Sequence, residues 1–387
     1  MSAWQELAPL TIATSLVFGM VVALAGSVRQ PLAKRLEIAE ERVGGLLAVF
    51  NLAMIPVVLA AGVVIDRLGA KEVLMLGSLL AALGTFALAA CRSYRGCQYA
   101  LLVLGAGAAC LNASAIVLMP QAFFELREAA SLNFGCFFFG LGALLTPALI
   151  EVLKRFASLR RTLMLLAFLC LLPAAVALWT PGDKLLTPDG QGHLAQVLRT
   201  PLVWLAALAF LLYAPIEGAL GTWAGTYLSD LGLRERRAAA WLSGFWLTFL
   251  GARLLAAWFQ QRAIFLVQGS EPWFILGLAF LAAVALGNLA GTRRPTAAAR
   301  GLIVVGGLLG PIFPTLVGFL FQPAHVPQAS RGTAYGAMYA IGASLSLVLP
   351  PLIGSYARRT SVRMALRLPT AVALVLAGVA LVLGLVP

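Results

Sequence analysis

Charged residues are scarce in this sequence of 387 residues. Only 11% are Asp, Glu, Lys or Arg and 61% are hydrophobic, whereas about a quarter of the residues of a soluble globular protein are charged. This composition excludes a soluble globular protein. The charges are also unbalanced, with 28 Lys and Arg against 15 Asp and Glu, a formal net charge of +13. Because the basic residues stand between long apolar runs, they bear on membrane topology rather than on nucleic-acid binding.

Motifs that carry chemistry are missing as well. The sequence has no G-x-x-x-x-G-K-[ST] loop, which argues against an ATP-driven transporter within this chain. It has no G-x-S-x-G elbow and no metal-ligand spacing, so we expect no enzyme activity, metal or cofactor. The five cysteines are an odd number and form no CxxC pair. We therefore predict that they are small apolar residues in or beside membrane spans, not disulfides.

Long apolar segments dominate the chain. A transmembrane helix needs about 20 mostly apolar residues, and twelve segments meet this length. The sequence therefore predicts an all-α integral membrane protein with twelve spans. The first span has an acidic flank and no clear cleavage site, so it is expected to remain as a helix. The segments lie near residues 8–29, 43–65, 73–91, 98–123, 129–150, 161–180, 201–228, 238–260, 273–292, 299–321, 331–356 and 364–386.

The spans divide evenly about a polar stretch in the middle of the chain. Residues 1–180 and 201–387 each hold six spans, and residues 181–200 form a central linker, expected to be cytoplasmic. Two pseudo-symmetric six-helix halves are typical of transporter folds with internal repeats. The 38 glycines and 20 prolines are spread through the spans, as in helices that pack closely and kink around a cavity.

The loop between the second and third spans carries a family signature. Its glycine lets two helices touch, its carboxylate can face a helix N-terminus or a cation, and its basic residues can bind helix C-termini or lipid phosphates. It resembles the signature loop of the major facilitator superfamily, which implies that fold with cytoplasmic termini. The loop reads Gly62-Val-Val-Ile-Asp66-Arg67-Leu-Gly69-Ala-Lys71.

Three further segments resemble the fucose:proton symporter family and its sugar-transporting relatives. They are residues 132–147 in the fifth span, 217–223 in the seventh and 310–315 (Gly-Pro-Ile-Phe-Pro-Thr) in the tenth. This resemblance implies a monomer in a bacterial inner membrane that binds a small-molecule substrate near the bilayer midplane. It also implies a coupling ion, H⁺ or Na⁺. No nucleic-acid partner is expected.

The sequence departs from that family at the residues that couple transport to protons. The family's proton-coupled sugar carriers place carboxylates in the first and fourth spans, where this chain has a small residue near Ser27 and Asn112. An amide can bond a sugar hydroxyl but has no proton to cycle. Cys136 and Phe139 replace polar amides in the fifth span, which predicts a more apolar cavity. A changed substrate and a loss of coupling both fit these differences.

Glu217 remains as a carboxylate deep within the seventh span. An ionisable residue at that depth is costly and indicates function, although a structural salt bridge is the alternative. We predict that Arg29, at the far end of the first span, approaches Glu217 when the outer gate closes. The first and seventh spans are equivalent in the two halves, which favours this pair. Arg253, in the eighth span, is expected to contact helix ends near the cytoplasmic face.

The predicted substrate site combines aromatic rings with amides. Rings that stack on sugar faces and amides that bond hydroxyls are a common site chemistry, and Trp223 with Asn112 is the best pair. Tryptophans also mark membrane interfaces, and amides also cross-link helices, so a structural role is the alternative. The predicted substrate-binding residues are Asn112, Asn133, Tyr213, Glu217, Trp223 and Trp246.

The distribution of basic residues conflicts with the orientation that the family implies. Loops after odd-numbered spans hold nineteen Lys and Arg and loops after even-numbered spans hold seven. Short cytoplasmic loops are usually the basic ones, whereas the family orientation puts the odd-numbered loops outside. The chain is inverted, the span count is shifted, or the outer surface attracts an anionic substrate or anionic envelope components. We predict the family orientation and call the surface with the odd-numbered loops the odd-loop face.

Three functions fit these observations. The first is a secondary active or facilitative transporter that moves a small, sugar-like solute by alternating access. The second is an exporter of an amphipathic or anionic compound, which the apolar fifth span and the basic odd-loop face favour. The third is a transport-inactive scaffold or assembly protein with the same fold, which the missing carboxylates favour.

Overall fold

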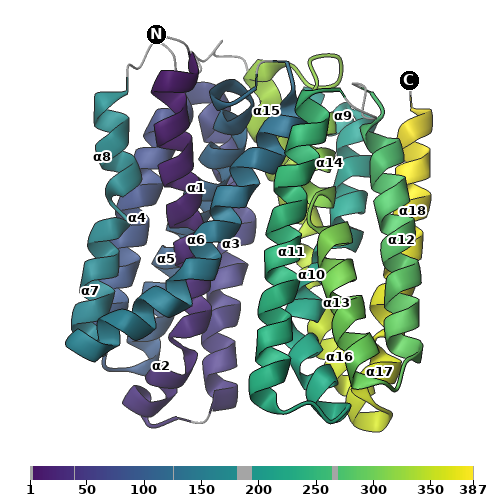
Figure 1. The fold of residues 1–387 in the computed structure, drawn as a ribbon. Coiled ribbons are helices and arrows are strands. Elements are labelled where there is room, and N and C mark those ends of the chain that lie inside the picture. The colour runs from purple at the N-terminus through teal and green to yellow at the C-terminus, as the bar shows by residue number, and fades with distance from the viewer. Residues whose placement is uncertain (1–2, 39, 125, 181–193, 264–268, 387) are drawn as a thin grey trace. The chain divides into compact units, whose positions relative to one another are not determined.

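A computed structural model of the chain describes residues 3–38, 40–124, 126–180, 194–263 and 269–386. Within these residues, twelve helical segments are long and apolar enough to cross a membrane (Figure 1). Each overlaps one predicted span, which confirms the all-α, twelve-span prediction. Most of the predicted linker, residues 181–193, lies outside the described residues, and its last part forms the short helix α9 (Leu194–Arg199).

The helices of the first six spans follow the order of the sequence. The sixth span is split into α7 and α8, with Pro173 in the first turn of α8, where the missing N–H of a proline is tolerated. The helices are α1 (Ala3–Ser27), α2 (Arg29–Leu36), α3 (Glu40–Leu68), α4 (Ala70–Ala90), α5 (Tyr94–Ala122), α6 (Glu128–Phe156), α7 (Leu159–Leu169) and α8 (Leu172–Trp179).

The last six spans contain more interruptions. The tenth is broken between α13 and α14, and the eleventh contains the 3-10 segment η3. The elements are α10 (Pro201–Asp230), α11 (Glu235–Gln261), α12 (Glu271–Gly291), α13 (Pro295–Leu309), α14 (Ile312–Leu320), η2 (Gln328–Ser330), α15 (Arg331–Gly342), η3 (Ser344–Leu347), α16 (Leu349–Arg359), α17 (Val362–Ala365) and α18 (Arg367–Leu385).

The chain divides into two compact units of contacting residues. Helix α6 begins in unit 2 and continues in unit 1, whereas α15 begins in unit 1 and continues in unit 2. Two helices are therefore shared between the units. Unit 1 comprises Met1–Leu126, Gly135–Val197 and Val326–Ala337, and unit 2 comprises Arg127–Phe134, Leu198–His325 and Met338–Pro387.

Helix α5 is the central helix of unit 1. It packs against α1, α3 and α4, and 83% of the residues in its most apolar stretch are buried. Glycines bring the backbones together, because a Cβ at Gly84 of α4 would lie only 2.6 Å from the backbone nitrogen of Leu104 in α5. Small residues allow this approach in a membrane, where packing holds helices together.

Helix α10 contacts most of the other helices of unit 2. It packs against α11, α14, α16 and α18, and α12 packs against α13, α14 and α18. Its 30 residues include Pro215, which removes one backbone donor within the span. Glu217 lies two residues further on, so this part of α10 carries both a proline and a carboxylate.

The cysteine prediction is wrong for one pair. Cys91 and Cys97 form a disulfide across the turn between α4 and α5, with Cα atoms 5.7 Å apart. Cys91 caps α4 in an extended conformation and Cys97 lies in the first turn of α5, so the tight helical hairpin brings them together. Cys110, Cys136 and Cys170 are buried free thiols, as predicted. The odd number of cysteines therefore did not exclude a disulfide between two of them.

Replacing Gly84 by alanine is expected to destabilise unit 1. The added Cβ must push Leu104 away, and overpacking of this kind costs about 1–3 kcal/mol. Gly277→Ala on α12 is the matched control, since a Cβ there meets nothing within 4 Å. Thermal unfolding of both variants in one detergent measures the effect. Equal unfolding temperatures would show that the α4 and α5 backbones are not in contact.

Candidate functional site

The signature-loop carboxylate caps a helix in unit 1. Asp66, in the last turn of α3, is only 6% exposed. Its two oxygens accept hydrogen bonds from the backbone N–H groups of Gly332, at 2.9 Å, and Thr333, at 2.7 Å. These donors lie in the first turn of α15, where helical N–H groups have no intrahelical partner and the helix dipole favours an anion. Asp66 therefore faces a helix N-terminus, one of the two positions expected for it.

Of the other residues of the signature loop, Gly62 lies at the same contact and the rest lie elsewhere. A Cβ at Gly62 would collide with the carbonyl oxygen of Gly332, so α3 and α15 touch through glycines, as expected. Gly69 has a φ of 105° at the start of α4, a conformation that favours glycine. Lys71 donates to the carbonyl oxygen of Thr180 at 3.0 Å, at the end of α8. Arg67 is exposed.

In unit 2, the break in the tenth span frees a backbone carbonyl. A helix would bond the oxygen of Gly310 to the N–H of the residue four positions on, but that residue is Pro314, which has none. Arg253 supplies the missing hydrogen-bond donor, since its Nε donates to Gly310 O at 2.9 Å. Arg253 thus contacts a helix end, as expected, but within the span rather than near the cytoplasmic face.

Glu217 lies beside this arginine. Its carboxylate hydrogen-bonds with the hydroxyl of Tyr213, one turn earlier on α10, and interacts with the charge of Arg253. The carbonyl oxygen of Leu309, 3.1 Å from the Tyr213 hydroxyl, is a second acceptor for the same proton. Tyr213 and Arg253 are buried, at 1% and 3% exposure, whereas Glu217 is half-buried. Glu217 is therefore the least buried residue of this polar centre.

Aromatic rings surround the polar centre. Phe210 packs against Phe313 and Tyr339, with ring centroids 4.9 and 5.5 Å apart. Trp246 lies over Gly221 of α10, where a Cβ would come within 3.3 Å of its ring. Gly221 is one turn beyond Glu217, so Trp246 belongs to the aromatic wall of this centre. The guanidinium of Arg253 lies 4.5 Å from the ring centre of Phe249, a cation–π contact.

Trp223 belongs to a different surface of α10. It packs on an apolar cluster formed by Ala219, Leu349, Ile353 and Ala365, and its ring lies 2.7 Å from the position of a Cβ at Gly354. Six residues separate it from Glu217, which is about 240° around a helix. Its contacts are those of a packing residue. Asn112 belongs to unit 1, so its pairing with Trp223 stays a prediction.

Asn133 cross-links three helices of unit 2. It is fully buried, and its amide nitrogen lies 3.0 Å from Gln260 Oε1 of α11 and 3.0 Å from Thr315 Oγ1 of α14. Gln260 Nε2 also donates to Thr315 Oγ1 at 3.0 Å. The same helices touch where a Cβ at Gly318 would collide with Ala129 of α6. These bonds fit the helix-linking alternative better than substrate contact.

Asn112 has an unused donor. In unit 1, its Oδ1 accepts a hydrogen bond of 3.0 Å from the hydroxyl of Tyr335. Its Nδ2 has no partner among the described residues, although the side chain is 97% buried. A buried amide donor without a partner is costly, so this position suits a polar ligand atom or a water molecule.

The predicted gate pairs Glu217 with Arg29, whereas the polar centre of the structure pairs it with Arg253. The side chain of Arg29 lies outside the described residues, so its pairing with Glu217 stays a prediction. Arg253 is the cation that the structure brings to Glu217. Sequence reasoning missed this pair, and also the roles of Phe210, Phe313 and Tyr339. The spacing of Gly310 and Pro314 was the available signal, because it predicts a free carbonyl that requires a donor.

Comparison with known proteins identifies the family. The sequence model of the Major Facilitator Superfamily matches residues 10–351, so the chain belongs to this superfamily of membrane transporters. A search of curated proteins finds no match. The assignment therefore rests on the family model and on the fold.

Several solved structures share the fold over nearly the whole length. The transporter FucP, in the outward conformation, gives a TM-score of 0.77 with 18% identity over 97% of this chain and 98% of its own. A variant of the E. coli fucose:proton symporter FucP gives 0.77 with 19% identity over the same shares. The human organic anion transporter MFSD10 gives 0.76 with 14% identity over 98% and 100%. The proton:xylose symporter XylE, bound to 6-bromo-6-deoxy-D-glucose, gives 0.77 with 13% identity over 96% and 94%.

Removing the Asp66 carboxylate is expected to weaken the N-terminus of α15. Asp66→Ala loses two charge-assisted bonds to backbone N–H groups, and loss of a helix cap costs about 0.5–2 kcal/mol. Thermal unfolding in detergent measures the loss. Arg67→Gln, which changes the exposed neighbouring residue, controls for the charge of the loop. If both variants unfold at the wild-type temperature, the cap does not contribute to stability.

Proposed function

We propose that this chain is a secondary transporter that moves a small, sugar-like solute across a bacterial inner membrane by alternating access. The substrate contacts the polar centre of Glu217, Tyr213 and Arg253 in unit 2. The protein works as a monomer of two six-helix halves, and movement of the solute is coupled to H⁺ or Na⁺. The symporters FucP and XylE, which share the fold, support the sugar class.

The carboxylate of Glu217, within the seventh span, carries the proposal. A carboxylate within a membrane span is costly unless it is partnered and used, and Glu217 is partnered by the hydroxyl of Tyr213 and the charge of Arg253. Aromatic rings on one side and hydrogen-bonding groups on the other are the surfaces that a sugar ring requires.

An anionic substrate is the second candidate. Arg253 is a buried cation at the same centre, and a guanidinium binds carboxylates and phosphates in a fixed geometry. MFSD10, which shares the fold, is described as an organic anion transporter. For such a solute Glu217 would be the group that competes with the substrate for Arg253, so binding of substrate and protonation of Glu217 would favour each other.

Ligand-dependent stabilisation distinguishes these functions. A ligand that binds the folded protein raises its stability by RT ln(1 + [L]/Kd), or about 2.7 kcal/mol at one hundred times Kd. We expect the purified protein to be stabilised by one or more monosaccharides or polyols and by no organic anion. Stabilisation by anions alone would favour the second candidate. No response to either panel would favour a transport-inactive scaffold.

Neutralising Glu217 is expected to uncouple transport. In proteoliposomes, Glu217→Gln should lower proton-driven uptake at least tenfold and flatten its pH dependence, because an amide cannot release a proton. Exchange of labelled substrate, which needs no net proton movement, should persist. Glu235→Gln, which removes an exposed carboxylate at the start of α11, is the control. Wild-type uptake with unchanged pH dependence in Glu217→Gln would rule out both the coupling and the gate with Arg29.

The disulfide bears on the orientation of the chain. Disulfides persist in oxidising compartments and are rare in the cytosol, and Cys91–Cys97 lies in the loop after the third span. We propose that the odd-loop face lies outside the cytoplasm, as in the family orientation. The excess of basic residues on this face then has a role other than setting topology.

Thiol labelling tests the orientation. In intact spheroplasts, a membrane-impermeant reductant followed by an impermeant maleimide should add two labels to the wild type and none to the Cys91→Ser/Cys97→Ser variant. The remaining thiols are buried and should not react. If labels appear only after the membrane is permeabilised, the odd-loop face is cytoplasmic and the chain is inverted. Labelling without reductant would show that the pair is reduced.

A further inference from the structure

Two hollows lie on the surface of unit 1 along the line where α4 and α7 meet, here called the seam. Helices α4 and α7 pack against each other and run in opposite directions, since residues late in α4 face residues early in α7. One hollow lies along the middle of the seam and the other at the C-terminal end of α4. Neither contains a residue of the polar centre around Glu217.

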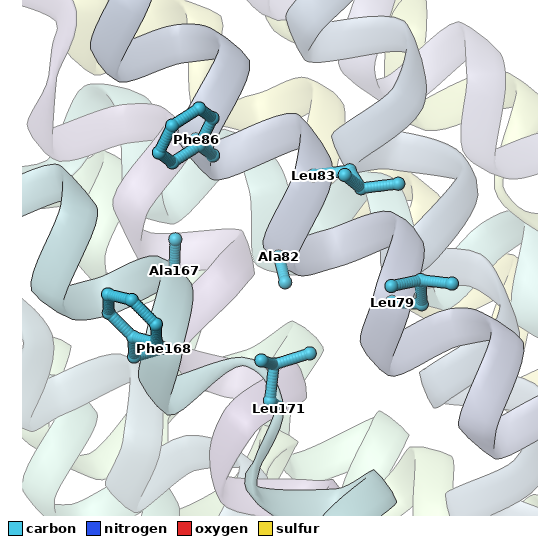
Figure 2. A pocket seen from close by; sticks show the side chains of 7 residues that line it. All are labelled: Leu79, Ala82, Leu83, Phe86, Ala167, Phe168 and Leu171. Atoms are coloured by element: carbon cyan, nitrogen blue, oxygen red, sulfur yellow. The ribbon is translucent and has the colours of Figure 1, made fainter.

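The hollow in the middle of the seam is apolar. It has a volume of about 270 Å³ and is lined by side chains such as Leu79, Leu83 and Phe86 of α4, with Phe168 of α7 and Leu171 opposite (Figure 2). Between 50 and 70% of Leu79, Leu83, Phe86 and Phe168 is exposed on the surface of the chain. In a bilayer this part of the seam faces hydrocarbon.

The hollow at the end of α4 is basic. It has a volume of about 340 Å³, and its lining includes three arginines, Arg35, Arg92 and Arg160, together with Ser158. None of the described residues that line it is acidic. Ser158 caps α7, whose N-terminal N–H groups point toward this end of the seam and favour an anion. Three cations and a helix N-terminus therefore converge on one small space.

Arg35 is held in place where the charges of Arg92 and Arg160 repel it. Arg35 donates to the carbonyl oxygens of Leu88, at 3.2 Å, Ala89, at 3.0 Å, and Cys91, which anchors its guanidinium at the end of α4. Burial lowers the pKa of Arg35, and the charges of Arg160 and Arg92 lower it further. The disulfide closes the short loop that carries Arg92. An anion between these groups would relieve the repulsion.

The two hollows lie at the right separation for one molecule. Lining residues of α4 recur at 79, 82, 83, 86, 89 and 90, a spacing that keeps them on one side of a helix. Phe86 is the last α4 residue that lines the apolar hollow, and Ala89 is the first that lines the basic one. Ala89 lies about one turn beyond Phe86, or about 5 Å along the helix axis. On the other side of the seam the residues run back from 171 to 158. A basic end near the membrane surface thus continues into an apolar groove within the bilayer.

We propose that the seam of α4 and α7 binds an anionic phospholipid. The phosphate lies among Arg35, Arg92 and Arg160, and an acyl chain follows the groove past Phe86, Phe168 and Leu171. Charge complementarity selects the headgroup, and the apolar groove selects a molecule with a hydrocarbon chain over a soluble anion. This site is independent of the proposed substrate site, since the two share no residue.

Lipid binding to the delipidated protein tests the site. Phosphatidylglycerol and phosphatidylcholine with identical acyl chains are titrated in detergent, and bound lipid is counted by native mass spectrometry. We expect wild-type protein to prefer phosphatidylglycerol, and Arg92→Gln/Arg160→Gln to bind it about 30-fold more weakly, at roughly fivefold per surface arginine. Arg35 is left intact because it caps α4. If the double variant does not fold, each single variant should lose about fivefold.

A matched charge control separates a site from general attraction. Arg236→Gln/Arg237→Gln removes two exposed arginines from the start of α11, also on the odd-loop face but in unit 2, and should leave binding unchanged. Equal losses in the two double variants would overturn the proposal. Equal affinity of the wild type for the two lipids would overturn it as well.

Two further measurements locate the ligand. Phosphatidylglycerol with a photoreactive group in its acyl chain should cross-link to peptides of α4 and α7, and uniform labelling of all surface helices would contradict the groove. Inorganic phosphate and glycerol phosphate should raise the unfolding temperature far less than phosphatidylglycerol does. If inorganic phosphate stabilises the protein equally well, the basic hollow is a soluble-anion site and the lipid proposal is wrong.

Discussion

Backbone polar groups in the middle of a membrane must find partners within the protein, and this constraint links the fold to the candidate site. Pro314 leaves the carbonyl of Gly310 without its helical donor, and Arg253 supplies one. An arginine in that position brings a charge into the bilayer, and Glu217 lies beside it as the opposite charge. The helix break, the buried cation and the carboxylate therefore form one arrangement.

The fold follows from the sequence because its cause is simple. A run of about 20 apolar residues is enough to cross the hydrocarbon, so the number of spans and their approximate ends could be predicted. The interruptions at α7 and α8, α13 and α14, and α15 to α16 depend on local geometry around proline and glycine, which span counting does not resolve. The disulfide was missed because Cys91 and Cys97 are six residues apart. This spacing indicates a disulfide only when the geometry of the turn between α4 and α5 is known.

The candidate site was partly predictable. Glu217 and Tyr213 could be found from depth and residue type, and Trp246 from its aromatic character. Helical geometry also separates Trp223 from Glu217, since six residues place it on another side of α10. Arg253 required knowledge of which carbonyl is free, and the network of Asn133, Gln260 and Thr315 depends on how three distant helices pack. Such contacts are not encoded by periodicity within one segment.

The cap on α15 also has a consequence for biosynthesis. Asp66 and Gly332 are 266 residues apart in the sequence, and a ribosome adds about 5–20 residues per second. The carboxylate is therefore made on the order of tens of seconds before its donors. During that interval the first spans are already in the membrane with a charged group that has no final partner. The order of synthesis thus requires a temporary arrangement at the end of α3, held by water or lipid headgroups, until the eleventh span arrives.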